Sequence, residues 1–189
     1  MVILIAGLVV FLGVHTLTTL REPRAALIGR LGDRGYRNLY SLVATIGLVL
    51  IVWGFALYRQ HDYLQVWRPP AWLHPIAFGL MWFSFVALAA AYAPSGRIKG
   101  ALRHPMLVGV KSWALAHLLV NGDLGAFLLF GAFILWAGYD RVMLRLRDDF
   151  GAPAADRFTR GDAIALAVGT LAWFAMFWLH PWLIGLPIS

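Results

Sequence analysis

The sequence predicts an all-α integral membrane protein, built as a bundle of about six transmembrane helices. Of the 189 residues, 61% are hydrophobic and only 13% are charged, whereas a soluble domain usually carries about 25% charged residues. The apolar residues are grouped into separate runs whose lengths approach the ~20 residues that a helix needs to cross a bilayer. Lipid, rather than water, is therefore the expected surrounding of most of this surface.

Each apolar run predicts one helix, and the helices together make a single domain over residues 1–189. The predicted spans are Val2–Leu20, Leu39–Tyr58, Trp72–Tyr92, Pro105–Val120, Leu124–Met143 and Ala163–Ile184. No basic residue precedes the first run and no small-residue cleavage site follows it, so we expect it to remain as a helix. The fourth run is short for a full span and contains Lys111 and His117. Only Asn121, Gly122 and Asp123 separate it from the fifth run, which predicts an antiparallel hairpin.

The basic residues predict which loops face the cytoplasm, because cytoplasmic loops of membrane proteins carry an excess of Lys and Arg. The second loop has only Arg59 and Arg68, and the fourth loop and both termini have none. The first, third and fifth loop regions hold 13 of the 16 basic residues, namely Arg21, Arg24, Arg30, Arg34, Arg37, Arg97, Lys99, Arg103, Arg141, Arg145, Arg147, Arg157 and Arg160. The sequence therefore predicts a multi-pass protein of a bacterial inner membrane with both termini in the periplasm.

The charge and the composition exclude several classes of function. The net charge of +7 does not indicate nucleic-acid binding, because the basic residues lie in short loops beside apolar runs. Anionic lipid headgroups of the bilayer are the expected partner. The chain has no cysteine, which excludes disulfides, thiolate ligands and thiol nucleophiles. It also contains no phosphate-binding loop, dinucleotide fingerprint, nucleophile elbow or metalloprotease helix.

Ionisable side chains inside a membrane span are costly, so each one is a functional candidate. Here these side chains are His15, Lys111, His117 and Asp140. We interpret the other histidines near the outer side, His61, His74 and His180, as interfacial residues.

His15 and His104 are the first candidate pair. His15 lies about five residues from the cytoplasmic end of the first predicted helix, and His104 directly precedes Pro105 at the cytoplasmic start of the fourth. The predicted topology gives them similar depths, and two imidazoles that face each other across a bundle can hold a haem iron. In the alternative interpretation, His15 hydrogen-bonds a neighbouring helix and His104 is an ordinary residue at a helix start.

Lys111 is the second candidate, because seven helical positions bring it onto the same face as His104. It can meet a haem propionate, a substrate anion or Asp140; alternatively it extends to the cytoplasmic interface. His117 lies about 20 Å further along the helix than His104, so the two cannot share one small metal site.

A second polar site is conceivable where His117, Asn121 and Asp123 meet at the outer end of the hairpin. In the simpler interpretation, Asn121 or Asp123 caps the next helix. Asp140 and Arg141 can likewise form an interfacial ion pair without any chemistry.

Two segments of the chain resemble the NnrU family: LRHPMLVGVKSWALAHLLVNGD at 102–123, and the run LLFGAFILWAGYDR that ends at Arg141. With GVHTLTTLR at 13–21, the resemblance extends over nearly the whole chain. It implies a membrane protein associated with denitrification, in nitrite and nitric oxide reduction, as a redox or accessory protein.

The same family includes the 15-cis-zeta-carotene isomerase, a membrane enzyme that depends on haem b. The resemblance implies that His15 and His104 correspond to its haem-ligating histidines, and hence a haem b cofactor here. Ala101 stands where the isomerase has an alternative cysteine ligand, so a ligand exchange of that kind is not expected. A haem-dependent cis-trans isomerase of a carotenoid-like polyene, entering from lipid, is the alternative to a role with a redox partner.

A weaker resemblance concerns membrane methyltransferases that use S-adenosylmethionine. RHPMLVG at 103–109 is similar to their RHP-x-x-x-G motif, and DDFGAPAADRFTR at 148–160 is similar to a second motif. The acidic pair that precedes the second motif in those enzymes is only Asp140-Arg141 here. Methyl transfer is the third function that the sequence implies.

Overall fold

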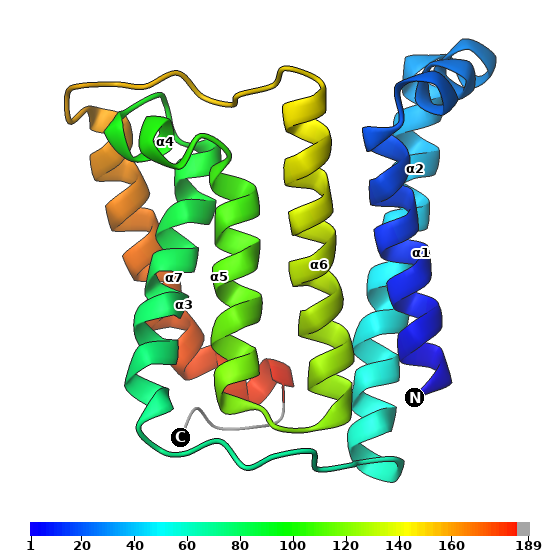
Figure 1. Ribbon diagram of the computed structural model, residues 1–189, viewed down its shortest axis with the longest axis vertical. Helices are drawn as coiled ribbons and strands as arrows, with labels where there is room; N and C mark the ends of the chain where they lie inside the picture. The colour runs from blue at the N-terminus through cyan, green and yellow to red at the C-terminus, as the bar shows by residue number, and fades with distance from the viewer. Residues whose placement is uncertain (185–189) are drawn as a thin grey trace. The chain divides into compact units, whose positions relative to one another are not determined.

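The computed structural model describes residues 1–184, and helices are the only regular elements within them (Figure 1). The helices are α1 (Val2–Thr19), α2 (Arg21–His61), α3 (Leu73–Tyr92), α4 (Arg97–Leu102), α5 (Pro105–Val120), α6 (Leu124–Leu146) and α7 (Arg160–Ile184). Among the described residues, α1, α2, α3, α6 and α7 are long and apolar enough to cross a membrane, which makes five candidate spans. The all-helical prediction is confirmed for this part of the chain. The remaining predicted span, α5, has 16 residues and is shorter than the ~20 that a full crossing needs.

Residues 21–38 are helical, so the prediction of a loop between the first two spans was wrong. Gly32, with φ 70° and ψ 166°, divides α2 into two helical segments. In the first of these, residues 21–31, the arginines are exposed while Leu27 and Ile28 are half-buried. This pattern makes an amphipathic basic helix, which a search for long apolar runs does not detect.

The chain divides into two compact units. The first comprises Met1–Arg68 and Gly122–Leu144, and the second comprises Pro69–Asn121 and the described residues from Arg145 onward. The arrangement of the two units relative to each other is not determined (Figure 1), so each is described by itself.

In the first unit, α1 and α2 pack with their backbones in close approach at glycines. A Cβ atom on Gly7 would lie 2.6 Å from the backbone nitrogen of Ile51, and one on Gly47 would lie 2.7 Å from that of Phe11. Small residues at such positions let two helices gain van der Waals contact where the hydrophobic effect is weak.

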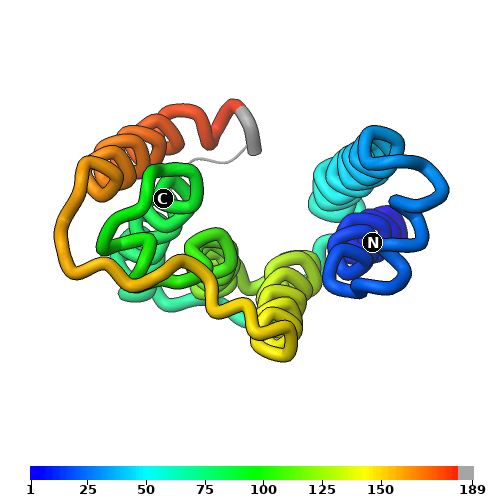
Figure 2. Tube along the Cα trace, turned by 90° about the horizontal axis from the view of Figure 1, so that it is seen from above, coloured from blue at the N-terminus to red at the C-terminus, as the bar shows by residue number. Residues whose placement is uncertain are grey.

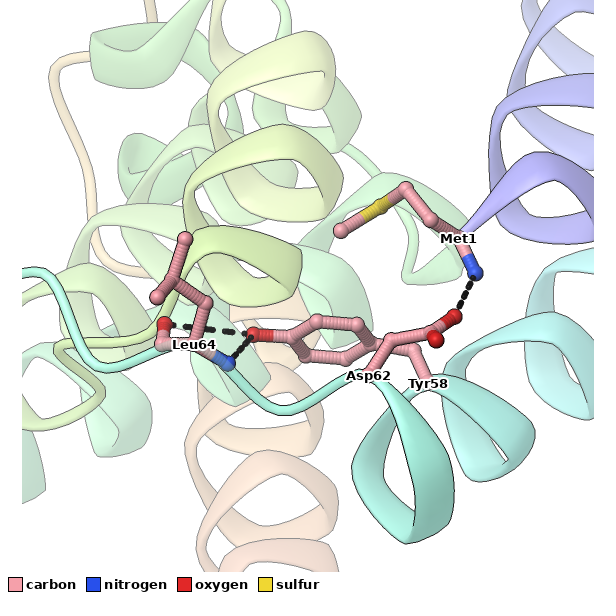
Figure 3. A network of polar contacts seen from close by, with 4 residues as sticks. All are labelled: Met1, Tyr58, Asp62 and Leu64. Carbon is pink, nitrogen blue, oxygen red and sulfur yellow. Dashed lines mark hydrogen bonds and ion pairs between the residues drawn. The ribbon is translucent and has the colours of Figure 1, made fainter.

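One end of the first unit is fixed by polar contacts around the fully buried Tyr58 (Figure 3). Its hydroxyl accepts a hydrogen bond from the backbone N–H of Leu64 at 3.1 Å and donates to the carbonyl oxygen of Leu64 at 3.4 Å. Nearby, the ammonium of Met1 donates to the Asp62 carboxylate at 2.7 Å, which lowers the pKa of this exposed carboxyl. These contacts join the chain after α2 to the start of α1.

In the second unit, α3 contacts both α5 and α7 (Figure 2). Ser84 of α3 donates from its hydroxyl to the carbonyl oxygen of Gly109 at 2.8 Å, and a Cβ atom on Gly169 would lie 2.6 Å from Cα of Val86. Helix α5, although short, is therefore held along one side by a longer helix.

Asp162 connects the starts of two helices of this unit. Its carboxylate is 1% exposed and accepts hydrogen bonds from the backbone N–H groups of Ile98 at 2.7 Å, Arg97 at 3.0 Å and Thr159 at 2.7 Å. Helix N-termini leave N–H groups without intrahelical partners, and a carboxylate is a preferred acceptor for them. One side chain thus caps both α4 and α7.

Candidate functional site

His15 lies in an aromatic shell formed by three helices of the first unit. Its ring centroid is 4.2 Å from that of Phe11 on α1, 5.5 Å from Tyr40 on α2 and 5.7 Å from Trp136 on α6. The Trp136 ring meets the imidazole edge-on, at 86° between the planes. The His15 side chain is half-buried, so the three rings leave part of its surface exposed.

The hydrogen bond of His15 determines which ring nitrogen is available. Nδ1 lies 2.6 Å from the carbonyl oxygen of Phe11. A carbonyl oxygen only accepts, so Nδ1 carries the proton and donates, and in neutral imidazole the lone pair then lies on Nε2. Among the described residues no hydrogen bond to Nε2 is found. Metal-ligating histidines usually have this arrangement, with one nitrogen on a carbonyl and the other on the metal.

Helix α6 is held against α1 by two side-chain hydrogen bonds. Trp136 donates from Nε1 to the hydroxyl oxygen of Thr16 at 3.1 Å, and that hydroxyl donates to the carbonyl of Leu12 at 2.8 Å. The hydroxyls of Thr19 and Tyr139 share a hydrogen bond of 3.1 Å. These contacts fix the position of the Trp136 ring beside His15.

His104 lies in the second unit, at the residue that precedes α5. Its Nε2 is 3.3 Å from the carbonyl oxygen of Asp149, so Nε2 donates there and Nδ1 is the nitrogen without a hydrogen bond among the described residues. Beside it, the backbone N–H of Ala152 donates to the carbonyl of Arg103 at 2.8 Å. A Cβ atom on Gly151 would lie 2.8 Å from Nε2 of His104. The RHP motif therefore packs directly on the segment 149–152.

Lys111 is half-buried on α5 and forms no hydrogen bond or ion pair within residues 1–184. Asp140 belongs to the other unit, so the predicted Lys111–Asp140 contact stays a prediction. Arg141 has a buried Nη1 without a hydrogen-bond partner and no ion pair among the described residues. The alternative of an Asp140–Arg141 ion pair is therefore not supported.

The polar residues between α5 and α6 make local hydrogen bonds. Asp123 accepts at Oδ1 from the backbone N–H of Ala126 at 2.9 Å, so the interpretation of Asp123 as a cap is confirmed. Asn121 instead donates from Nδ2 to the carbonyl of His117 at 2.8 Å. His117 and Asp123 belong to different units, so a second polar site there stays a prediction.

Two histidines of the second unit, His117 on α5 and His180 on α7, lie near each other, which no pattern in the sequence indicates. His117 also repeats the local geometry of His15, since its Nδ1 is 2.8 Å from the carbonyl of Trp113, four residues earlier. This resemblance makes His117 a suitable control for His15.

His15 and His104 belong to different units, so their predicted pairing stays a prediction. Within the described part of the chain, no group of three histidine or carboxylate side chains forms a metal cage. The features that remain are one ring nitrogen on each histidine that is open to a ligand, and the aromatic shell around His15.

Comparison with protein families gives one match: the family described as NnrU protein, over residues 3–188. Neither the curated proteins nor the solved structures contain a match to the chain. The matched range includes both candidate histidines and all seven described helices apart from the first residue of α1. The chain belongs to the NnrU family.

Proposed function

We propose that this protein binds haem b in the membrane, and that Nε2 of His15 would hold the iron. The observation that supports this most directly is the hydrogen bond from Nδ1 of His15 to the carbonyl of Phe11, which orients the ring and leaves Nε2 for iron. The aromatic shell of Phe11, Tyr40 and Trp136 is a suitable wall for a porphyrin, because aromatic rings stack favourably with one another.

His104 is the proposed second ligand, and Lys111 the proposed partner of a propionate. His104 has a free Nδ1; coordination through Nε2 instead requires release of the Asp149 carbonyl. The half-buried ammonium of Lys111 has no partner within residues 1–184, and a carboxylate would satisfy it. When bound, haem b would supply one-electron redox chemistry.

The proposed role is that of a redox or accessory protein in nitrite and nitric oxide reduction, as membership in the NnrU family suggests. We place it in the bacterial inner membrane with six spans, the basic loops in the cytoplasm and both termini in the periplasm. The packing of α5 against α3 supports α5 as the sixth span, since protein shields part of this short helix from lipid.

Two enzymatic alternatives remain. A cis-trans isomerase of a carotenoid-like polyene requires a labile iron position, so ready binding of carbon monoxide to the reduced protein favours it over a redox role.

A methyltransferase is favoured by one observation, the contact of the RHP motif with the segment 149–152. Binding of S-adenosylmethionine by haem-free protein tests this alternative.

The experiment compares His15→Ala, His104→Ala and His117→Ala in detergent, after expression in a haem-replete host. We expect both ligand variants to lose haem and to shift the Soret band. His117→Ala removes a histidine with the same local hydrogen bond, and should retain the wild-type spectrum. Unchanged spectra in His15→Ala would refute the ligand assignment.

A further inference from the structure

The first unit contains a cavity of about 450 Å³ between α1 and α2. Its walls are apolar: Val14 and Leu17 come from α1, Val43 comes from the second segment of α2, and Leu27 comes from residues 21–31. Cavities of roughly 300–1,000 Å³ with apolar walls and few polar groups are typical of small-molecule sites.

Tyr36, which lines this cavity, has an unsatisfied hydroxyl. The residue lines the cavity and is 7% exposed. Its hydroxyl is buried without a hydrogen-bond partner among the described residues. Buried polar groups in folded proteins are nearly always paired, so the free hydroxyl indicates a ligand oxygen that completes the site.

The basic helical segment, residues 21–31, contributes Leu27 to the wall of the cavity. The positive φ of Gly32 lets this segment turn back. The segment lies at the end of the first unit opposite the N-terminus (Figure 1). The guanidinium of Arg24 lies 5.9 Å from the centre of the Tyr36 ring, and Arg30, Arg34 and Arg37 are exposed nearby in the sequence. Clusters of basic residues beside a membrane span attract anionic lipids.

We infer that the cavity binds an acyl chain of an anionic phospholipid. The acyl chain lies against Val14, Leu17 and Leu27. An oxygen of the glycerol ester or the phosphate accepts a hydrogen bond from the Tyr36 hydroxyl, and the guanidinium of Arg24 neutralises the phosphate. None of the proposed haem ligands, nor Lys111, lines the cavity. Tyr40 lines it and also belongs to the aromatic shell of His15, so loss of lipid binding in Gly13→Leu is to be compared with haem content in the same variant.

Gly13 offers a sharp test, because it lines the cavity and a Cβ atom there meets nothing within 4 Å. Gly13→Leu therefore fills the cavity without displacing backbone. Gly131→Leu on α6 is the matched control, since a Cβ atom there also meets nothing within 4 Å and Gly131 does not line the cavity.

The measurement is native mass spectrometry of the full chain in neutral detergent, titrated with phosphatidylglycerol, phosphatidylcholine or oleate. We expect one tightly bound phosphatidylglycerol that is lost in Gly13→Leu and kept in Gly131→Leu. Tyr36→Phe should weaken it about tenfold, since a hydrogen bond to a charged group is lost. Arg24→Gln, an exposed change that does not threaten folding, should weaken it about fivefold.

Two results would overturn the inference. Equal binding of the two phospholipids, or binding that survives in Gly13→Leu, would show that the cavity is not the lipid site. Tighter binding of oleate than of phosphatidylglycerol would assign the cavity to a free fatty acid instead.

Discussion

Replacing Asp162 by Ala should destabilise the second unit strongly. The change removes the acceptor of three backbone N–H groups at the starts of α4 and α7, in a carboxylate that is almost fully buried. At about 1 kcal/mol for each hydrogen bond that is not replaced, the expected loss is about 3 kcal/mol. For a chain of this size that corresponds to a fall of about 6–12 °C in Tm.

The assay is thermal unfolding in detergent, followed by tryptophan fluorescence. Asp156→Ala is the matched control, because Asp156 is exposed in the same connection; it should leave Tm within about 1 °C. Gly96→Ala should act in the same direction as Asp162→Ala, since a Cβ atom on Gly96 would lie 2.6 Å from Cγ of Asp162. A Tm for Asp162→Ala equal to that of the Asp156 control would refute the capping argument.

Two further predictions concern the first unit. Tyr58→Phe leaves the N–H of Leu64 without its 3.1 Å partner and should cost about 1–2 kcal/mol; urea unfolding measures the loss, and an unchanged midpoint argues against this contact. Gly47→Leu places a side chain 2.7 Å from the backbone of Phe11 and should lower the free energy of unfolding by about 2 kcal/mol. Gly13→Leu, whose side chain enters open space, should be tolerated. Equal thermal stability of the two variants would contradict the close packing of α1 on α2.

The apolar helices could be predicted from the sequence because hydropathy alone defines them. The predicted bounds of Pro105–Val120 agree with α5, and those of the first span differ from α1 by one residue. The helices at residues 21–31 and at α4 were not predicted, because an amphipathic or very short helix has no long apolar run. Their stability comes from tertiary contacts, such as the reach of Asp162 to Arg97 and Ile98.

The site was partly accessible to sequence reasoning. His15 could be selected because a histidine within a span is costly, but its neighbour Trp136 is more than a hundred positions away and only packing brings it there. The capping role of Asp162 was not predicted, although Thr159 and Asp162 have the spacing of a capping box. In the structure the Thr159 hydroxyl accepts a hydrogen bond from the N–H of Gly161 at 3.1 Å. The free hydroxyl of Tyr36 has no signature in sequence at all.

Haem b, held by His15 and His104, is the cofactor that we propose for this NnrU protein. The most direct test is a pyridine haemochrome assay, with a reduced-minus-oxidised spectrum, on wild-type protein purified from a haem-replete host. We expect b-type haem at close to one per chain. Protein that shows a cooperative thermal unfolding transition, and is therefore folded, but stays free of haem after reconstitution would contradict haem binding.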